Sequence, residues 1–128
     1  MNYTFTKVLN ASMSDAVERV TAALAAKGFG VLTTIDVKAT LKKKLDVDFR
    51  PYVILGACNP EFAYQALQHE DKIGAMLPCN VVVQELDKDR VEVSAVDPVA
   101  SMQAVANPKL GAVATEVRDR LKSVIHNL

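Results

Sequence analysis

The stretch RPYVILGACNP, residues 50–60, decides how the rest of this chain is organised. Tyr52 to Ala57 form a nearly unbroken apolar run, which predicts a strand that is central in its sheet or covered on both faces. Pro51 lacks an amide donor, a loss that the first residue of a strand tolerates. After Cys58, Asn59-Pro60 ends the strand and places proline in the first turn of a helix, a position that proline favours. The stretch therefore predicts a buried strand that leads directly into a helix.

Apolar residues follow strand or helix periods along the rest of the chain. Further strands are expected over residues 3–9, 29–37, 80–86 and 91–96. Helices are expected over residues 12–28, 38–45, 60–70 and 110–126, with short helical pieces near 73–77 and 99–106. Ser12 and Asp15 form a capping pair at the start of the first helix, and Gly28 is a C-terminal cap at its end. The pattern predicts an α+β domain of about five strands.

The second expected strand alternates without interruption, which predicts that one parity of its residues lies on a single face of the sheet. These residues are Phe29, Val31, Thr33, Ile35 and Val37. The segment after it places Leu41 and Leu45 four residues apart around a run of three lysines. This spacing is typical of a short amphipathic helix that exposes its charged side to solvent.

The composition limits the classes of function. The chain has 128 residues, 50% hydrophobic and 23% charged, so we expect one globular domain over residues 1–128. Fifteen basic residues balance fifteen acidic ones, so we expect no nucleic-acid partner that depends on phosphate neutralisation. No secretory signal and no stretch of ~18 apolar residues are present, so we expect no membrane span. The expected compartment is the cytoplasm, where thiols are kept reduced.

The two strands that follow the second cysteine flank a polar segment and are expected to form a hairpin. Pairing its innermost residues places Asn80 opposite Asp97. The same pairing sets Glu85 against Glu92, an unfavourable pair of like charges that a shift of one residue would remove. The sequence therefore predicts which strand ends are neighbours and leaves the register open.

Three chemically distinctive residues stand where expected strands begin or end. One strand leaves the sheet at Cys58, the chain re-enters it at Cys79, and the last strand leaves it at Asp97. If the strands before and after the intervening helix are antiparallel, all three residues lie at one edge of the sheet. The expected ligand-binding set consists of these residues and the two asparagines beside the cysteines: Cys58, Asn59, Cys79, Asn80 and Asp97.

Three roles of the cysteines stay open. Cys58 and Cys79 can bind a soft metal such as Cu(I) or Zn(II), with Met76 or Met102 as a further soft ligand. They can exchange with a disulfide, because a helix that starts after Cys58 lowers a thiol pKa if its amides point at the sulfur. They can also be small packing residues, the most frequent fate of a free cysteine. Their separation in the sequence matches no known metal or redox motif.

Signatures of common enzymes are missing from the sequence. It has no glycine-rich phosphate loop, no Gly-x-Ser-x-Gly elbow and no His-Glu-x-x-His helix. His69 and His126 are its two histidines, and both fall on polar helix ends where acid–base chemistry has little to work with. The sequence therefore favours a function other than catalysis.

Three motifs that occur in order, GFGVLTTIDVKATLKKKLDVDFRPYVILGACNP, LPCNVVV and SAVDP, resemble the bacterial and archaeal family called domain of unknown function 302. The resemblance extends from Val17 to Val124. The family pattern matches this chain at Gly-x-Cys-Asn-Pro, Leu-Pro-Cys and Asp-Pro elements. The matching positions are Gly56, Cys58, Asn59, Pro60, Leu77, Pro78, Cys79, Asp97 and Pro98.

This resemblance implies a curved antiparallel sheet with helices packed mainly on one face, similar to the TATA-binding-protein-like fold and usually seen as a homodimer. It brings no established activity, and the zero net charge departs from that of a minor-groove DNA binder. The leading interpretation is a non-catalytic binding module with a small-ligand or soft-metal pocket near Cys58, Cys79 and Asp97. The alternatives are a thiol-dependent redox enzyme or sensor and a protein-interaction domain with structural cysteines.

Overall fold

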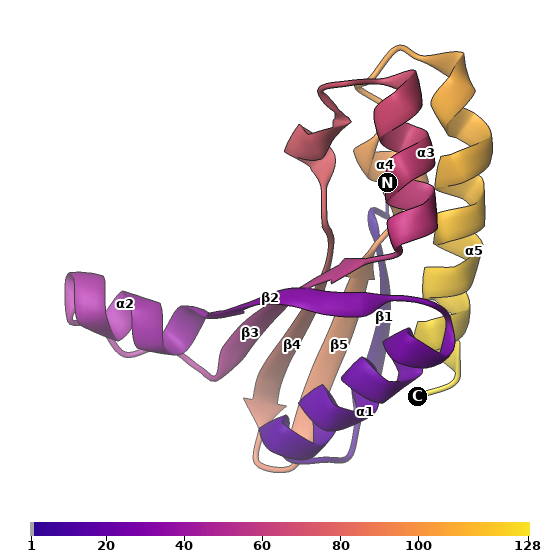
Figure 1. Cartoon of the computed structure of the whole chain (residues 1–128). Helices are drawn as coiled ribbons and strands as arrows, with labels where there is room; N and C mark the ends of the chain where they lie inside the picture. Colours follow the sequence, from indigo (N-terminus) through magenta and orange to yellow (C-terminus); the bar gives the residue numbers. More distant parts are fainter. Residues whose placement is uncertain (1) are drawn as a thin grey trace.

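An antiparallel sheet of five strands forms the frame of the structure, a computed structural model that describes residues 2–128. The strands are β1 (Thr4–Leu9), β2 (Gly30–Asp36), β3 (Tyr52–Cys58), β4 (Cys79–Asp87) and β5 (Arg90–Val96). Their order across the sheet is β1-β5-β4-β3-β2, and each neighbouring pair is antiparallel (Figure 1). The expected strands are confirmed, and β3 is an interior strand between β4 and β2, as its apolar run predicts.

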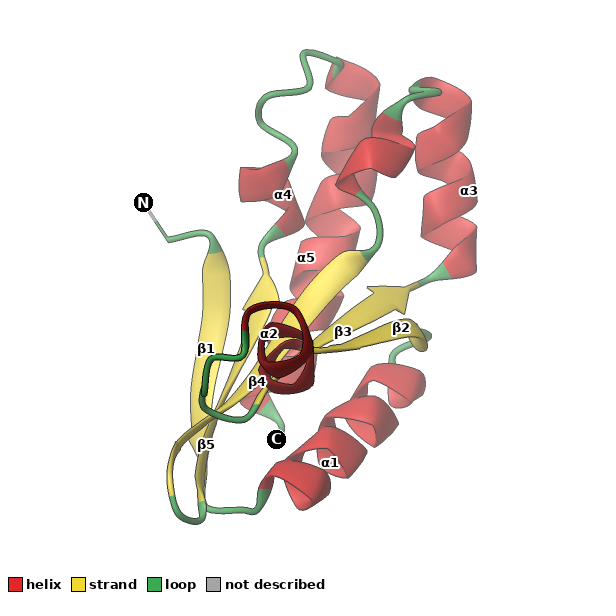
Figure 2. Ribbon diagram, turned by 90° about the vertical axis from the view of Figure 1, so that its left-hand side faces the viewer, coloured by secondary structure: helices red, strands yellow, loops and turns green. Residues whose placement is uncertain are grey.

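Three helices lie on one side of this sheet (Figure 2). They are α1 (Met13–Ala26), α3 (Pro60–His69) and α5 (Gly111–His126). The first and last of them pack against the strands, and α3 packs against α5. Shorter helical pieces are η1 (Ile73–Met76), α4 (Pro98–Ser101) and η2 (Pro108–Leu110). The expected α+β class, with helices mainly on one face of an antiparallel sheet, is confirmed.

The core fills the space between these helices and the covered face of the sheet. Its fully buried side chains include Val20 and Leu24 of α1, Leu121 and Ile125 of α5, and Leu55, Val81, Val83, Val91 and Val93 of the sheet. Burying a valine or leucine side chain contributes roughly 1.5–3 kcal/mol, so this layer is what holds the helices onto the strands.

The predicted helix start and stop signals are confirmed. The side chain of Ser12 accepts a hydrogen bond from the amide of Asp15 at 3.2 Å. Gly28 has a φ of 85°, a left-handed conformation that ends α1 and that glycine adopts without strain. At the start of α3, the side chain of Asn59 accepts a hydrogen bond from the amide of Phe62 at 3.4 Å. These local features explain why α1 begins and ends, and α3 begins, where the sequence predicts.

The uninterrupted alternation expected for β2 is wrong. Between Val31 and Thr33 the pairing with β3 shifts by one residue, so that Leu32 is an extra residue and forms a β-bulge. Val31 therefore faces the helices, whereas Thr33 and Ile35 face away from them. The residue types do not locate the bulge, because Val31 and Leu32 are both apolar and Thr33 and Thr34 are both polar.

The β4–β5 hairpin also differs by one residue from the register obtained by pairing its innermost residues. Glu92 pairs with Gln84, and the Nε2 of Gln84 donates a hydrogen bond to a carboxylate oxygen of Glu92 at 3.4 Å. An irregularity between Glu85 and Asp87 produces the shift. It removes the pair of like charges that the simple register would create.

The shifted register changes which residues meet at the far end of the hairpin. Val81 pairs with Ala95. Continuing the same antiparallel pairing outward places Cys79, and not Asn80, opposite Asp97. The expectation that Asn80 faces Asp97 is therefore wrong, although the strand ends are neighbours as predicted.

The segment between β2 and β3 forms an arm that projects from the rest of the domain (Figure 1). The arm contains α2 (Val37–Leu45), the short helix expected from the lysine-rich segment, and no residue of this fully described helix is buried. Lys42 forms ion pairs with Asp46 and Asp48 at 3.1 and 3.3 Å. Such exposed pairs contribute at most about 1 kcal/mol each, so the arm has little stabilisation of its own.

The face of the sheet opposite the core carries none of α1, α3 and α5 (Figure 2). Paired residues form rows across this face. One row crosses all five strands through Thr6, Ser94, Val82, Ile54 and Ile35. We call this surface the open face, and its apolar part lies on the side next to the arm.

None of the helices in residues 2–128 combines the length and the apolar character needed to cross a membrane. The five-stranded antiparallel arrangement agrees with the fold implied by the family resemblance. The finer likeness to the TATA-binding-protein-like fold stays a prediction.

Candidate functional site

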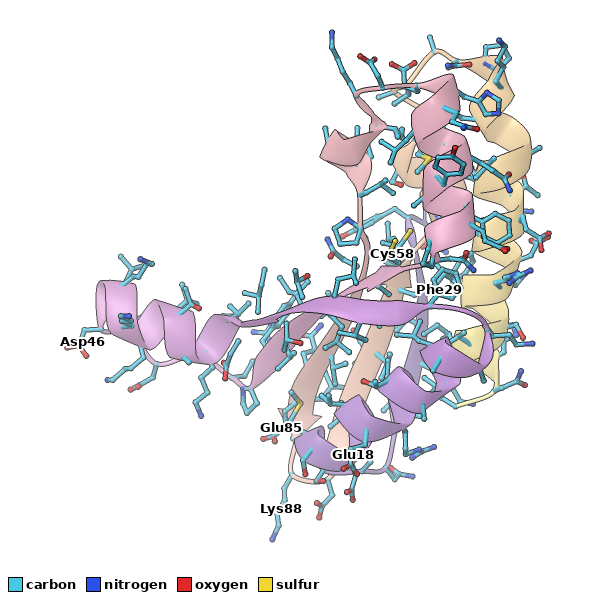
Figure 3. The ribbon with its side chains drawn as sticks, viewed as in Figure 1. Glu18, Phe29, Asp46, Cys58, Glu85 and Lys88 are labelled. Atoms are coloured by element: carbon cyan, nitrogen blue, oxygen red, sulfur yellow. The ribbon has the colours of Figure 1, made fainter. Side chains whose placement is uncertain are left out.

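An apolar cavity lies where β3 ends and α3 begins, and we call it the inner cavity. Its walls come from the end of the sheet, from α3 and from α5, and Figure 3 labels Phe29 and Cys58 at this place. Its volume is about 30 Å³. The lining residues are Phe29, Ala57, Cys58, Asn59, Phe62, Ala63, Ala66, Leu77, Cys79, Pro98, Met102, Val113, Ala114 and Val117.

The inner cavity is small and offers few polar partners. Its volume exceeds the roughly 10–15 Å³ that one water molecule requires, whereas pockets for drug-sized ligands measure roughly 300 Å³ or more. Apart from two thiols, Asn59 is its one polar lining side chain, and that side chain already bonds to Phe62. A water there would lack the two to four partners it normally needs, as a rough guide. The cavity therefore suits an apolar group, and a larger ligand needs a wall to move.

The two cysteines line the inner cavity but do not form the expected cysteine pair. Across β3 and β4, the partner of Cys79 is Ala57 and not Cys58. Because side chains alternate along a strand, Cys58 and Cys79 leave their strands in opposite directions, and Cys58 borders the cavity from the end of β3. Both thiols are free, and they are not close to one another.

Burial raises the pKa of both thiols. The pKa of Cys79 is raised to about 11, mainly by desolvation, and the charge of Cys58 adds a smaller contribution. Desolvation alone raises the pKa of Cys58. Since the thiolate is the reactive form, both side chains stay protonated and weakly nucleophilic at neutral pH. The start of α3 therefore does not activate Cys58 in the way that the redox interpretation requires.

Residues 2–128 contain no group of three or more His, Cys, Asp or Glu side chains arranged to hold a metal. Met102 joins the two cysteines in lining the inner cavity, whereas Met76 lies outside it on the surface. A soft metal needs thiolates that converge on one point. Cys58 and Cys79 leave their strands in opposite directions, so the geometry gives the soft-metal interpretation no support.

Asp97 has a structural role at the start of α4. Its Oδ1 accepts hydrogen bonds from the amides of Val99 and Ala100 at 2.9 and 3.5 Å. Its own amide donates to the carbonyl of Tyr3 at 2.7 Å. The neighbouring Pro98 lines the inner cavity, but Asp97 does not. The carboxylate therefore caps a helix, and a direct contact with a ligand stays a prediction.

Asn59 and Asn80, the remaining members of the expected ligand-binding set, lie in different places. Asn59 is buried and caps α3. Asn80 is exposed and pairs with Gly56 in a row of the open face. With Cys79, it lines a separate surface hollow of about 230 Å³. The structure therefore gathers Cys58, Asn59 and Cys79 around one cavity and leaves Asn80 outside it.

Residues of two helices complete the inner cavity, and the sequence indicated them only as core positions. Ala63 and Ala66 stand three residues apart on α3, and Val113 and Val117 stand four apart on α5. Such spacing predicts a buried helix side but not whether that side is filled. The signal for a cavity was the pair of alanines, because small side chains at facing positions leave space between a helix and its neighbours.

Arg120 of α5 contacts α3 beside the cavity. Its guanidinium lies 4.8 Å from the centre of the Phe62 ring, a cation–π contact. The same group donates a hydrogen bond to the carbonyl of Lys27 at 3.3 Å and binds Glu116 at 3.2 Å. One side chain therefore links α3, α5 and the end of α1.

Comparison with known proteins supplies the family. A profile of the family described as "Domain of unknown function DUF302" matches residues 5–128. The chain belongs to the DUF302 family. A search of curated proteins gave no match to it. Among solved structures, the crystal structure of an uncharacterized conserved protein DUF302 from Bacillus stearothermophilus is 28% identical in sequence, covers 98% of this chain and 98% of its own, and has a TM-score of 0.89.

Membership of DUF302 confirms the resemblance seen in the three sequence motifs. The similarity to the Bacillus stearothermophilus protein extends over nearly the whole of both chains, so the two proteins share the same α+β arrangement. The description of that protein names no activity. A function for this DUF302 domain must therefore be argued from its own site.

Proposed function

We propose that this DUF302 domain is a non-catalytic binding module that takes a small apolar ligand in the inner cavity. The observation that carries the proposal is the lining of the cavity, in which apolar side chains from the sheet, α3 and α5 surround two protonated thiols. Burial of an apolar ligand in this cavity is favourable, and such a ligand has no polar group that would lose its hydrogen bonds there. Ligand pockets are commonly lined in this way.

Binding requires the inner cavity to expand, and α3 is the wall best able to move. Of the residues of α3, all of which are described, only Ala66 is buried. Tyr64 and Leu67 on its outer side are exposed. Elements with few buried apolar contacts open at a low cost in free energy. A ligand that binds only the opened form shifts the population of the domain toward it.

The proposal is tested with n-hexanol as a probe and with ¹³C-labelled alanine and methionine methyl groups observed by NMR. We expect saturable shifts in the methyl signals of Ala63, Ala66 and Met102, which line the cavity. The signals of Met13 and Ala112, which do not line it, report non-specific effects of the solvent. Shifts that fail to saturate, or that are equal at all five methyl groups, would overturn the proposal.

A pair of matched variants tests whether n-hexanol binds in the inner cavity. Ala63→Leu adds three carbon atoms at a half-buried position of the lining, so we expect it to abolish the saturable shifts. Ala112→Leu makes the same change at an exposed position of α5 and should leave them intact. Circular dichroism of both variants checks that the fold is kept.

The partner that we propose is a second copy of the chain, bound through the open face and the arm. Ile35 of the open face is 48% exposed, and Leu45 of the arm is 66% exposed. Clusters of exposed apolar side chains mark surfaces that associate. A helix without buried residues, such as α2, also gains most from a partner, because short helices depend on packing for their stability.

The competing functions have weaker support. A redox enzyme or sensor requires a thiol with a lowered pKa, but burial raises the pKa of both Cys58 and Cys79. A protein-interaction domain with structural cysteines is compatible with the open face, which can bind another protein as well as a second copy. The inner cavity favours the binding module, because a purely structural core is normally filled.

A further inference from the structure

Two hollows of the domain share wall residues. One is the inner cavity, and the other is a surface cleft of about 210 Å³ between α4 and the start of α5. Met102 and Ala114 line both of them. A residue that lines two hollows forms the wall between them, so the inner cavity and the cleft are separated by these two side chains.

Met102 is the side chain that can open this wall. It is only partly buried, and it stands at the C-terminal end of α4. Methionine is unbranched and has several rotatable bonds, so it changes its shape readily within a core. Ala114, in contrast, is buried on α5 and has no side-chain torsion that could move a heavy atom. Rotation of Met102 would therefore join the cavity to the cleft.

The volumes of the inner cavity and of the cleft indicate which shape of ligand fits the joined space. The inner cavity, at about 30 Å³, is far below the ~150 Å³ of a cavity known to accept a benzene ring. The cleft is larger and mostly apolar, with Val99, Val105 and Leu110 in its wall. A narrow end that continues into a wider cleft fits a slender chain and excludes a ring.

We propose that the domain binds an unbranched alkyl chain whose tail enters the inner cavity and whose remaining length lies in the cleft, with Met102 as the movable wall between them. This inference rests on the proposed function and specifies its ligand class and route of entry. A ligand that enters through the cleft does not need to displace Cys58. It also does not need to break the hydrogen bond between the amide of Phe62 and the side chain of Asn59.

The polar end of the chain is expected to face solvent at the mouth of the cleft. None of the described residues that line the cleft is charged. Asn107 of the lining is already engaged, because its amide nitrogen donates to the carbonyl of His69 at 2.8 Å and its oxygen accepts from the amide of Lys109 at 3.0 Å. Recognition should therefore depend on the length of the chain and not on the charge of its head.

The test measures the affinity of a series of n-alkanols from butanol to decanol by NMR of labelled methionine methyl groups. We expect each added CH₂ to raise the affinity about three- to fourfold until the space is full. n-Octanoate should bind within about twofold of n-octanol, because no lining charge recognises the head. 2-Phenylethanol has as many carbons as n-octanol and should bind at least about tenfold more weakly, because the ring cannot enter the narrow end.

Two substitutions of Met102 test the wall. Met102→Ala joins the cavity and the cleft permanently. The gain in affinity per added CH₂ of the n-alkanol should therefore continue to longer chains than in the wild type. Met102→Phe places a rigid ring in the wall and should end the gain at shorter chains. Met13→Ala removes a partly buried methionine that lines neither hollow and should leave the dependence on length unchanged. Thermal unfolding of each variant checks that it is folded.

The possible outcomes separate this inference from the proposed function. If alkanols bind and shift the signals of Ala63 and Ala66, but their length dependence is the same in both Met102 variants, the route through the wall is wrong and the binding module stands. If 2-phenylethanol binds as tightly as n-octanol, the slender-chain inference is wrong. If no alkanol binds saturably, both proposals fail together.

Discussion

The hydroxyl of Thr33 occupies the space in which a Cβ on Gly56 would lie. The two residues are direct partners across β2 and β3, in a row of the open face. Cγ of Pro78 stands 2.8 Å from the same point. Glycine is therefore required at this position by close packing across the sheet and not by its backbone conformation.

We expect Gly56→Ala to destabilise the domain by about 1–3 kcal/mol, because the added methyl overpacks the contact with Thr33 and Pro78. Gly30→Ala is the matched control, since Gly30 also lies in a strand and no atom stands within 4 Å of the position of its Cβ. It should leave the stability unchanged or raise it by up to about 1 kcal/mol. Urea unfolding measures both changes, and equal losses in the two variants would contradict the packing argument.

The raised pKa of Cys79 makes stability depend on pH. The folded thiol has a pKa of about 11, whereas an unfolded thiol has one near 9.0. Between these values the unfolded chain has lost a proton that the folded chain keeps, so the free energy of unfolding decreases as the pH rises. The protonated thiol thus contributes fully below pH 9, and we expect a loss of about 2–3 kcal/mol by pH 11.

Urea unfolding between pH 7 and pH 11 measures this loss as the difference between the wild type and Cys79→Ala. The variant lacks the titrating group, so the difference between the two proteins should shrink as the pH rises. Cys58→Ala is the control. Its free energy of unfolding should depend on pH more nearly as that of the wild type does, because Cys58 is more exposed than Cys79. A constant difference between the wild type and Cys79→Ala would show that burial does not protect the thiol.

The same thiols should be poor nucleophiles. With iodoacetamide, we expect Cys58 to react faster than Cys79, because Cys79 is buried and Cys58 is partly exposed. For both, the rate should rise about tenfold per pH unit through neutral pH and level off only above pH 9, where the thiolate becomes the main form. Cys58→Ser and Cys79→Ser assign each reaction to its residue. A thiol that reaches its full rate near neutral pH would instead restore the redox interpretation.

The proposed homodimer predicts which substitution produces a monomer. Ile35→Lys places a charge in the apolar part of the open face and should reduce the mass measured by light scattering from twice to once the 13.9 kDa of the chain. Tyr64→Lys is the control, because Tyr64 is 65% exposed but lies on the outer side of α3. Dissociation by Tyr64→Lys and not by Ile35→Lys would place the interface on the helices.

The elements could be predicted from the sequence because their signals are local. The Ser12 cap, Gly28 and the Asn59-Pro60 break each act within one turn of backbone, so three or four residues suffice to place a helix end. Hydrophobic periodicity then identified the strands and the buried sides of the helices. The family motifs supplied the antiparallel arrangement that local signals do not determine.

The pairing of strands could not be predicted from the same information. The bulge at Leu32 adds one residue that the residue types around it do not mark, and the shift near Glu85 depends on the geometry of the β4–β5 turn. A change of one residue reverses every face that follows it, so small local irregularities have large consequences for the register. The unfavourable pairing of Glu85 with Glu92 was the one sequence signal that indicated such a shift.

The candidate site was predicted only in part, because polar residues at strand ends have two common uses. Asn59 and Asp97 stand where a ligand could bind, but the same residue types also cap helices, and that is what their bonds to backbone amides show. The residues that close the inner cavity come from distant parts of the chain, such as Met102 and Val117. No sequence spacing reveals that their side chains leave a space between them.

The bulge at Leu32 lets β2 differ in length without changing the faces of the residues that follow it. Deletion of this single residue would place Thr33 directly after Val31 and still opposite Gly56, so Ile35 would stay opposite Ile54 on the open face. The arm would then present the same residues to the outside. Among DUF302 sequences, a one-residue difference in length at this position should therefore leave the order of apolar and polar residues along the arm unchanged.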